Sequence, residues 1–187
     1  MRDRASASIL LARAAVLYDE ASGTLAPAAR CAWRKGFPGG AAWMQMALAR
    51  IRGTESVGRA ASWTRLGLGK YGLALSAALA PAGAAWALGI PALALLAVPA
   101  FYAVEAPLAF VFPAALDGAA DPAGLSRALC RRAGGTRAAM AVILPIATAM
   151  LMGGFAGRGF LRSWCLGCLA VCIWYEDLRG AASGGEP

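Results

Sequence analysis

A run of 46 residues between Lys70 and Asp117 contains a single charged side chain, that of Glu105. An α-helix needs about 20 predominantly apolar residues to cross the hydrocarbon core of a bilayer, which is about 30 Å thick. The run is therefore long enough for two crossings, and the uncharged segment Gly89-Ile90-Pro91 provides a turn signal near its middle. This stretch predicts an integral membrane protein.

The composition of the chain agrees with this class. Hydrophobic residues make up 59% of the 187 residues, whereas about 45–50% is usual for a soluble domain. The chain has no His, which excludes Ser-His and Cys-His nucleophiles and most zinc or haem sites. We therefore predict no metal site. The chain is rich in Ala, Gly and Arg and has no Asn, a composition typical of a GC-rich bacterial genome.

Four apolar segments predict an all-α integral membrane protein, built as a four-helix transmembrane bundle of two hairpins. The segments are 71–88, 92–116, 138–156 and 159–178. The fourth is the weakest, because its apolar part covers only residues 163–175. It spans the bilayer only if Arg162 snorkels at one end and Glu176 and Asp177 lie among headgroups at the other. The alternative is a re-entrant or interfacial helix.

The parts outside the transmembrane region, 70–178, are predicted from charge and turn signals. Residues 1–69 carry more than half of the Lys and Arg residues and predict amphipathic helices lying at the cytoplasmic membrane interface. We expect two such helices, at about 6–21 and 40–52, separated by a helix-breaking segment, 36–40. Residues 179–187 are expected to form a disordered tail.

The loop between the second and third segments contains a helix signal. Asp121 suits the N-cap, Pro122 the first helical position, and Gly134-Gly135 the end. We predict a short helix on the lipid surface, whose arginines contact anionic headgroups. These arginines are Arg127, Arg131 and Arg132.

The distribution of basic residues predicts the orientation in the membrane. Lys and Arg are concentrated before the first segment and between the second and third, so the positive-inside rule places both termini in the cytoplasm of a bacterial inner (plasma) membrane. The net charge of +8 arises from residues that flank apolar segments, without interleaved aromatics. This pattern favours a lipid surface with anionic headgroups and argues against nucleic acid.

Glu105 is the first candidate for chemistry. A charged carboxylate in the hydrocarbon core costs about 2.5 kcal/mol or more, so it either takes up a proton or finds a partner. Tyr102 lies one turn earlier and shares its face, and the flanking Pro99 and Pro107 favour a polar pocket or kink. We interpret Glu105 as a proton carrier, a ligand contact or a counter-charge for a partner helix. The alternative is a protonated side chain that joins two helices.

Cysteines are the second candidate. Cys165, Cys168 and Cys172 are spaced as one stripe of a helix, and the first two form a C-x-x-C. In span count and this motif the chain is similar to the four-helix vitamin K epoxide reductase family of membrane thiol oxidoreductases, which implies a quinone as cofactor. That family passes electrons through further cysteines outside the membrane, for which the turn at residues 89–91 is too short. Packing of small apolar side chains is the alternative.

These features leave three classes of function. The first is a small non-catalytic accessory or scaffold protein that contacts lipid, a partner membrane protein or a second copy of itself. The second is a thiol–quinone oxidoreductase that uses Cys165 and Cys168. The third is a lipid-handling enzyme or carrier that uses Glu105 with the cytoplasmic arginines. The short loops and the missing catalytic set favour the first, for which no catalytic residue is assigned and no cofactor is identified.

Overall fold

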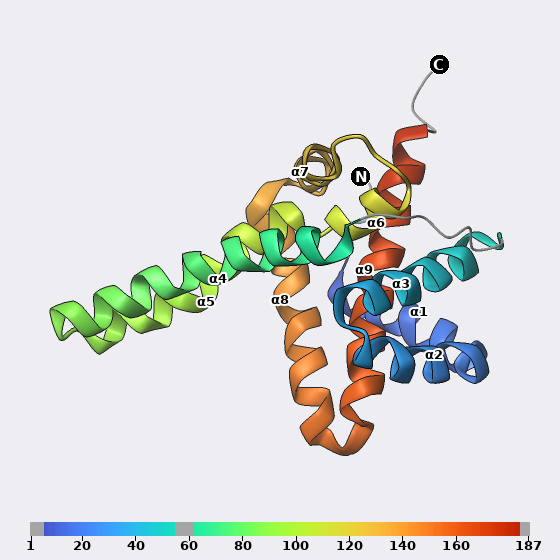
Figure 1. Cartoon of the computed structure of the whole chain (residues 1–187), viewed down its shortest axis with the longest axis horizontal. Helices are drawn as coiled ribbons and strands as arrows, with labels where there is room; N and C mark the ends of the chain where they lie inside the picture. Colours follow the sequence, from blue (N-terminus) through green and yellow to red (C-terminus); the bar gives the residue numbers. More distant parts are fainter. Residues whose placement is uncertain (1–5, 55–61, 184–187) are drawn as a thin grey trace.

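The computed structural model describes residues 6–54 and 62–183, and within these ranges every regular element is helical (Figure 1). The long helices are α1 (Ala7–Glu20), α2 (Ser22–Arg34), α3 (Gly36–Arg52), α4 (Trp63–Leu88), α5 (Ala97–Glu105), α7 (Pro122–Arg132), α8 (Gly135–Gly153) and α9 (Phe160–Ser183). The short ones are η1 (Pro91–Leu96), η2 (Ala106–Leu108), α6 (Val111–Leu116) and η3 (Gly154–Arg158). The predicted all-α class is confirmed. Residues 179–183, expected in a disordered tail, continue α9, and 184–187 lie outside the described ranges.

The N-terminal region has three helices where the sequence predicts two. The expected break at residues 36–40 is wrong, because residues 36–40 belong to α3 and the chain leaves the helical conformation only at Lys35 and at Gly36, whose φ is 60°. Pro38 falls in the first turn of α3, where its missing N–H removes no intrahelical hydrogen bond. The helix α2 was not predicted from the sequence.

These helices share a hydrophobic core with α9. Leu10, Ala14 and Tyr18 of α1 are buried, as are Leu25 of α2 and Trp43 of α3. The indole N–H of Trp43 donates a 3.0 Å hydrogen bond to the backbone carbonyl of Leu25, which satisfies a buried polar group between α2 and α3. The N-terminal helices are thus packed into the body of the molecule.

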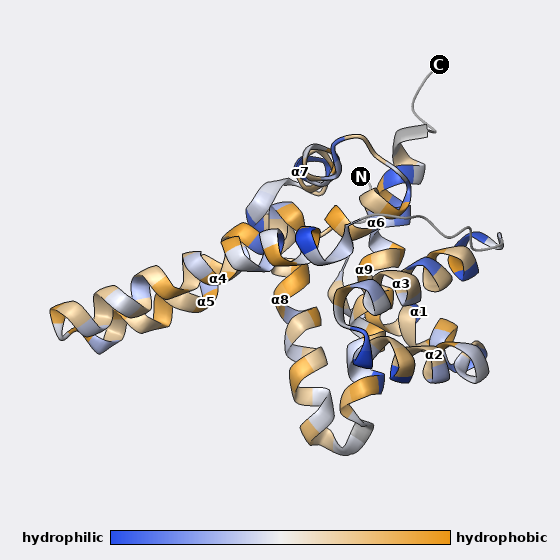
Figure 2. Ribbon diagram, viewed as in Figure 1, coloured by the Kyte–Doolittle hydropathy of each residue, from blue (hydrophilic) through white to orange (hydrophobic). Residues whose placement is uncertain are grey.

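A helical hairpin leaves this body as a long arm. It consists of α4, η1 and α5, which lie side by side and extend away from all other elements (Figure 1). Most residues of the arm have apolar or neutral hydropathy, as the orange and pale colours of its ribbon in Figure 2 show. Three helical segments are long and apolar enough to cross a membrane: Trp63–Leu88, Pro91–Leu116 and Gly135–Gly157. The first two make up the arm and its continuation into the body.

The fourth predicted span coincides with α9, and the four-helix bundle is not confirmed. This helix does not reach the hydropathy of the other three segments. It packs against α1, and charged pairs join the two helices at Arg13–Asp177 and Asp19–Arg162. In Figure 1 the arm and α8 also leave the body in different directions. The two predicted hairpins therefore do not lie together as one bundle in this conformation.

The helix predicted from Asp121 is present as α7. The Asp121 carboxylate accepts a 2.8 Å hydrogen bond from the backbone N–H of Gly124, as expected for an N-cap. On the buried face of α7, the Ser126 hydroxyl donates to the carbonyl of Pro107 at 2.8 Å and accepts from the N–H of Phe110 at 3.0 Å. Ser126 thereby pairs backbone groups at the break between η2 and α6.

We expect Ser126→Ala to lower the free energy of unfolding by about 1–3 kcal/mol, because it leaves two buried backbone groups unpaired. The measurement is thermal unfolding in detergent, followed by tryptophan fluorescence. Thr148→Ala is the control, since the exposed Thr148 hydroxyl only bonds to a carbonyl within its own helix. Equal stability of the two variants would show that Ser126 does not hold this break.

A network of charged side chains joins three distant parts of the body around Asp117. The two guanidinium nitrogens of Arg52 donate to the two Asp117 oxygens at 2.8 and 3.0 Å. The Tyr175 hydroxyl donates to Asp117 at 2.7 Å, and Arg179 also binds this carboxylate. Burial raises the pKa of the Asp117 carboxyl, but the hydrogen bonds from Arg52 and Tyr175 outweigh it, so the pKa lies below its ordinary value.

This shift predicts an acid-sensitive contact. A carboxylate with a lowered folded-state pKa stabilises the fold above its unfolded pKa of about 3.9, and the contribution is lost as the pH falls through the folded value. We expect Asp117→Asn to melt at a lower temperature than the wild type at pH 7, and to lose less stability between pH 7 and pH 3. Glu20→Gln, at an exposed position, should behave as the wild type. If the melting temperatures of Asp117→Asn and the wild type fell by the same amount between pH 7 and pH 3, the acid-sensitive contact would not involve Asp117.

Candidate functional site: a buried ion pair beside an aromatic cavity

Glu105 has a partner at the base of the arm. Its Oε1 lies 2.7 Å from Nζ of Lys70, and the two side chains are 13% and 5% exposed. Lys70 is in the third turn of α4 and Glu105 ends α5, so the pair closes the hairpin where it joins the body. The second carboxylate oxygen, Oε2, is buried and has no hydrogen-bond partner among the described residues. The expectation that Glu105 needs a partner fits this contact, but the sequence did not identify Lys70.

Lys70 also contacts aromatic rings. Its ammonium nitrogen lies 4.9 Å from the centre of the Tyr71 ring and 5.7 Å from that of Phe112. These distances are within the range of cation–π attraction, which grows when the cation is removed from water. Phe37 stacks on both Tyr71 and Phe112, with ring centres 5.9 and 6.3 Å apart. The ion pair therefore supports a cluster of aromatic side chains.

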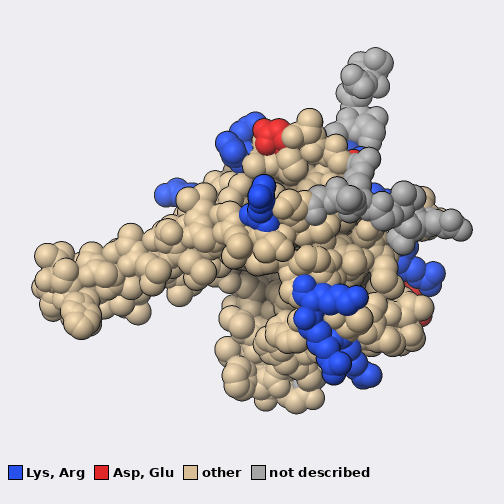
Figure 3. All heavy atoms as spheres, viewed as in Figure 1, with Lys and Arg blue, Asp and Glu red and all other residues tan. Residues whose placement is uncertain are grey.

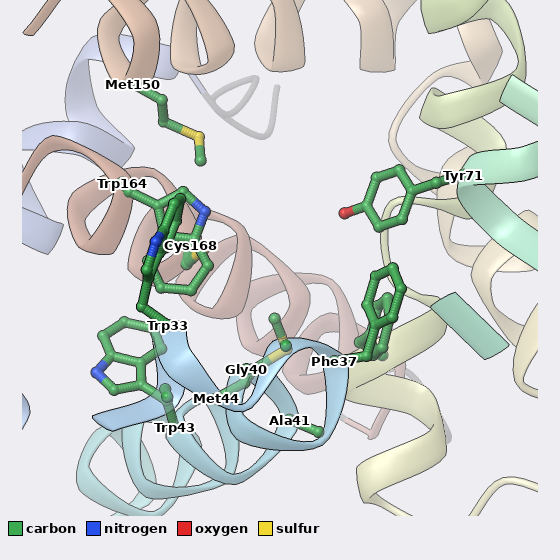
Figure 4. A pocket seen from close by; sticks show the side chains of 13 residues that line it. Trp33, Phe37, Gly40, Ala41, Trp43, Met44, Tyr71, Met150, Trp164 and Cys168 are labelled. Atoms are coloured by element: carbon green, nitrogen blue, oxygen red, sulfur yellow. The ribbon is translucent and has the colours of Figure 1, made fainter. Parts of the chain in front are cut away.

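These rings form one wall of a cavity of about 410 Å³. Trp33, Trp43 and Trp164 form the opposite wall, in which Trp164 contacts Trp33 edge-on and Trp43 at a tilt (Figure 4). Met44 and Met150 complete the lining between the two walls. A cavity of this size lies within the range of small-molecule pockets, about 300–1,000 Å³, which are mostly apolar with a few polar groups.

Two of the polar groups that line the cavity are the Tyr71 hydroxyl and the Cys168 thiol. The hydroxyl points into the open space, as Figure 4 shows. No charged side chain is among the lining residues. The cavity can therefore accept an apolar molecule and offer it a hydrogen-bond donor, but it does not neutralise a charge.

The structure separates the cysteines of the predicted stripe. Cys165 and Cys172 are fully buried, whereas Cys168 is partly exposed and lines the cavity. All three are free thiols. A redox role for Cys165 and Cys168 stays a prediction, and in it only Cys168 would meet a quinone in the cavity.

Of the remaining candidates, Tyr102 lies one turn before Glu105 on α5 and close enough to feel its charge, whereas the arginines of α7 stand apart from the ion pair. Tyr102 is partly buried and packs edge-on against Phe101, 5.2 Å between ring centres. Arg127, Arg131 and Arg132 are exposed on α7, and no hydrogen bond or ion pair of the described residues joins them to Glu105. Lys70 and the cavity aromatics were missed from the sequence. The available signal was the clustering of Trp33, Phe37 and Trp43 near Gly36 and Gly40, in a segment taken for a breaker.

No protein-family model matches this chain, and neither the curated proteins nor the solved structures include a match. The interpretation of the site therefore rests on its own geometry.

We expect Lys70→Met to lower the free energy of unfolding by about 3–5 kcal/mol, because it leaves the Glu105 carboxylate buried without a partner. The double variant Lys70→Met/Glu105→Met should recover most of this loss, since an apolar pair of similar volume needs no hydration. Thermal unfolding in detergent measures both. Arg65→Met, an exposed cation on the same helix, is the matched control. A double variant as unstable as Lys70→Met would show that packing, and not charge pairing, determines the loss.

Proposed function

We propose that this chain is a non-catalytic accessory or scaffold protein of a bacterial inner membrane, which contacts lipid or a partner membrane protein through its apolar arm. The observation that carries this proposal is an uncovered apolar hairpin, closed at its base by a buried ion pair. Large apolar side chains along it are exposed: Leu73, Leu75, Leu79, Trp86, Leu95 and Val98. Surfaces of this kind mark membrane or protein contacts, because exposing them to water is unfavourable.

The dimensions of the arm support insertion into a bilayer. The 34 residues between Lys70 and Glu105 carry no charge. From Lys70 to the end of α4 at Leu88 the helix rises about 27 Å, close to the hydrocarbon thickness of about 30 Å. Inserted to this depth, the arm places the Lys70–Glu105 pair near the membrane interface, where a charged pair is tolerated better than at the centre.

The charge distribution supports a cytoplasmic location for the body and both termini. Beyond its base, the visible surface of the arm is free of charged side chains, whereas basic side chains gather on the body (Figure 3). The exposed arginines of α7 form no ion pair within the described residues, which leaves them available for anionic headgroups. The two-hairpin bundle of the sequence prediction would require α9 to exchange its contacts with α1 for lipid. The proposal needs only the α4–α5 hairpin in the membrane, because its two crossings return the chain to the side from which it entered.

A photo-crosslinking amino acid tests which surface makes the contact. We expect a crosslinker at Leu79, on the exposed side of the arm, to form adducts with membrane lipid or with a discrete membrane protein in native membranes. The same crosslinking amino acid in place of Arg50, which is exposed on α3 in the body, should form neither kind of adduct. Mass spectrometry of the adducts distinguishes lipid from protein. Equal products from the two positions, or none from Leu79, would contradict the proposal.

A further inference from the structure

We propose that the aromatic cavity binds the hydrocarbon chain of an acidic amphiphile, such as a fatty acid or an acidic lipid, whose headgroup is held at the mouth by Arg34 and Lys35. This inference rests on the proposed membrane location, because a bilayer is the source of such molecules. It assigns an occupant to a cavity that the accessory role leaves unexplained.

The corner between α2 and α3 forms an outward-facing part of the cavity lining. Trp33 and Gly36 line the cavity, and both are exposed to the outside. Arg34 and Lys35 are the two residues between them in the chain, so their backbones lie at the rim. Their side chains are exposed. Figure 3 shows basic side chains gathered over this corner, beside the recess between the arm and the lower part of the body.

Neither cation is used elsewhere in the described part of the chain. Five of the acidic side chains there are in ion pairs, with Arg13, Arg52, Lys70, Arg162 and Arg179 as their partners. No ion pair or hydrogen bond of the described residues engages the side chains of Arg34 or Lys35. Two adjacent free cations at the rim of an apolar cavity are complementary to an anion attached to an apolar chain.

The polarity of the lining sets the orientation of the ligand. An acidic headgroup inside the cavity would meet no charged lining residue, and the Lys70 ammonium behind the Tyr71–Phe112 wall is already paired with Glu105. The headgroup would then have only weak donors such as the Tyr71 hydroxyl and the Cys168 thiol, and would remain largely uncompensated. The same headgroup at the mouth meets two cations and water. The hydrocarbon chain therefore points inward, between the tryptophan wall and the Tyr71–Phe112 wall (Figure 4).

Basic residues in the last turn of a helix also occur simply because they interact favourably with the helix dipole. The chain contains a control for this effect, because α7 ends in the adjacent exposed pair Arg131 and Arg132. None of the lining residues of the cavity belongs to α7. Removing either pair deletes two cations from a helix end, but only Arg34 and Lys35 lie beside a cavity.

The tryptophans of the cavity provide the readout. Bromine atoms quench tryptophan on contact, and three of the six tryptophans, Trp33, Trp43 and Trp164, line the cavity. We expect 9,10-dibromostearic acid at pH 8 to quench the tryptophan fluorescence of the full-length protein in a neutral detergent. The quenching should reach saturation as the acid is added, and unbrominated stearate should compete with it. Its methyl ester, which has the same chain and no charge, should bind about tenfold more weakly, the equivalent of about 1.4 kcal/mol.

Substitutions then separate the headgroup site from the cavity. Arg34→Gln/Lys35→Gln should weaken binding of the acid about tenfold and leave binding of the ester unchanged. Arg131→Gln/Arg132→Gln should change the binding of neither. Gly40 lines the cavity, and a Cβ added there meets no atom within 4 Å, so the side chain of Gly40→Leu starts in open space and takes up cavity volume. We expect it to abolish quenching while the melting temperature stays equal or rises, because Leu also favours the helix over Gly. Gly83→Leu, equally unobstructed but in the arm, is the control.

Two results would overturn the inference. Acid and ester binding equally, with no effect of Arg34→Gln/Lys35→Gln, would show that the cavity takes a neutral apolar molecule such as a quinone. Quenching that persists in Gly40→Leu would place the ligand elsewhere. Both measurements use detergent-solubilised protein, so they are independent of the contacts that the crosslinker at Leu79 detects in membranes.

Discussion

The contact between the Lys70 ammonium and the Glu105 carboxylate fixes how the arm is built and how it joins the body. Each charge alone would cost several kcal/mol to remove from water, so the two are stable in their buried position only together. Because they lie on opposite helices of the hairpin, sliding one helix by a single turn of about 5.4 Å would separate them. Lys70 also lies against Tyr71 and Phe112, so the register of the hairpin determines the position of one wall of the cavity.

Charge pairing organises the body in a similar way. Arg13 and Asp19 of α1 pair with Asp177 and Arg162 of α9, one pair on each side of the buried Tyr18 and Cys165. These contacts cover one side of α9 with α1. The cysteine stripe consequently faces other helices and the cavity, which agrees with small apolar packing residues at Cys165 and Cys172.

The parts predicted correctly from the sequence depend on local rules. The cap at Asp121 and the apolar character of the arm follow from residues within one helix or its immediate ends. Glu105 was expected to need a partner because an isolated carboxylate is costly in an apolar environment. Lys70 was not identified, since a uniform α-helix after Pro91 would rise only about 21 Å before Glu105. The 3₁₀ segment η1 rises about 0.5 Å more per residue, which carries Glu105 about 3 Å further towards Lys70.

The sequence by itself determined that this chain is helical, that two long segments are apolar enough to cross a membrane, and that the one carboxylate within the second segment requires compensation. Hydropathy, turn residues and caps decide these properties over distances of a few residues. Only the tertiary structure decided that α3 runs through a glycine-rich segment, that α9 is covered by α1, and that aromatic residues from α2, α3, α4, α6 and α9 surround one cavity. These depend on contacts between residues far apart in the chain, where the burial of many side chains outweighs the weak local preferences of Gly, Pro and Ala.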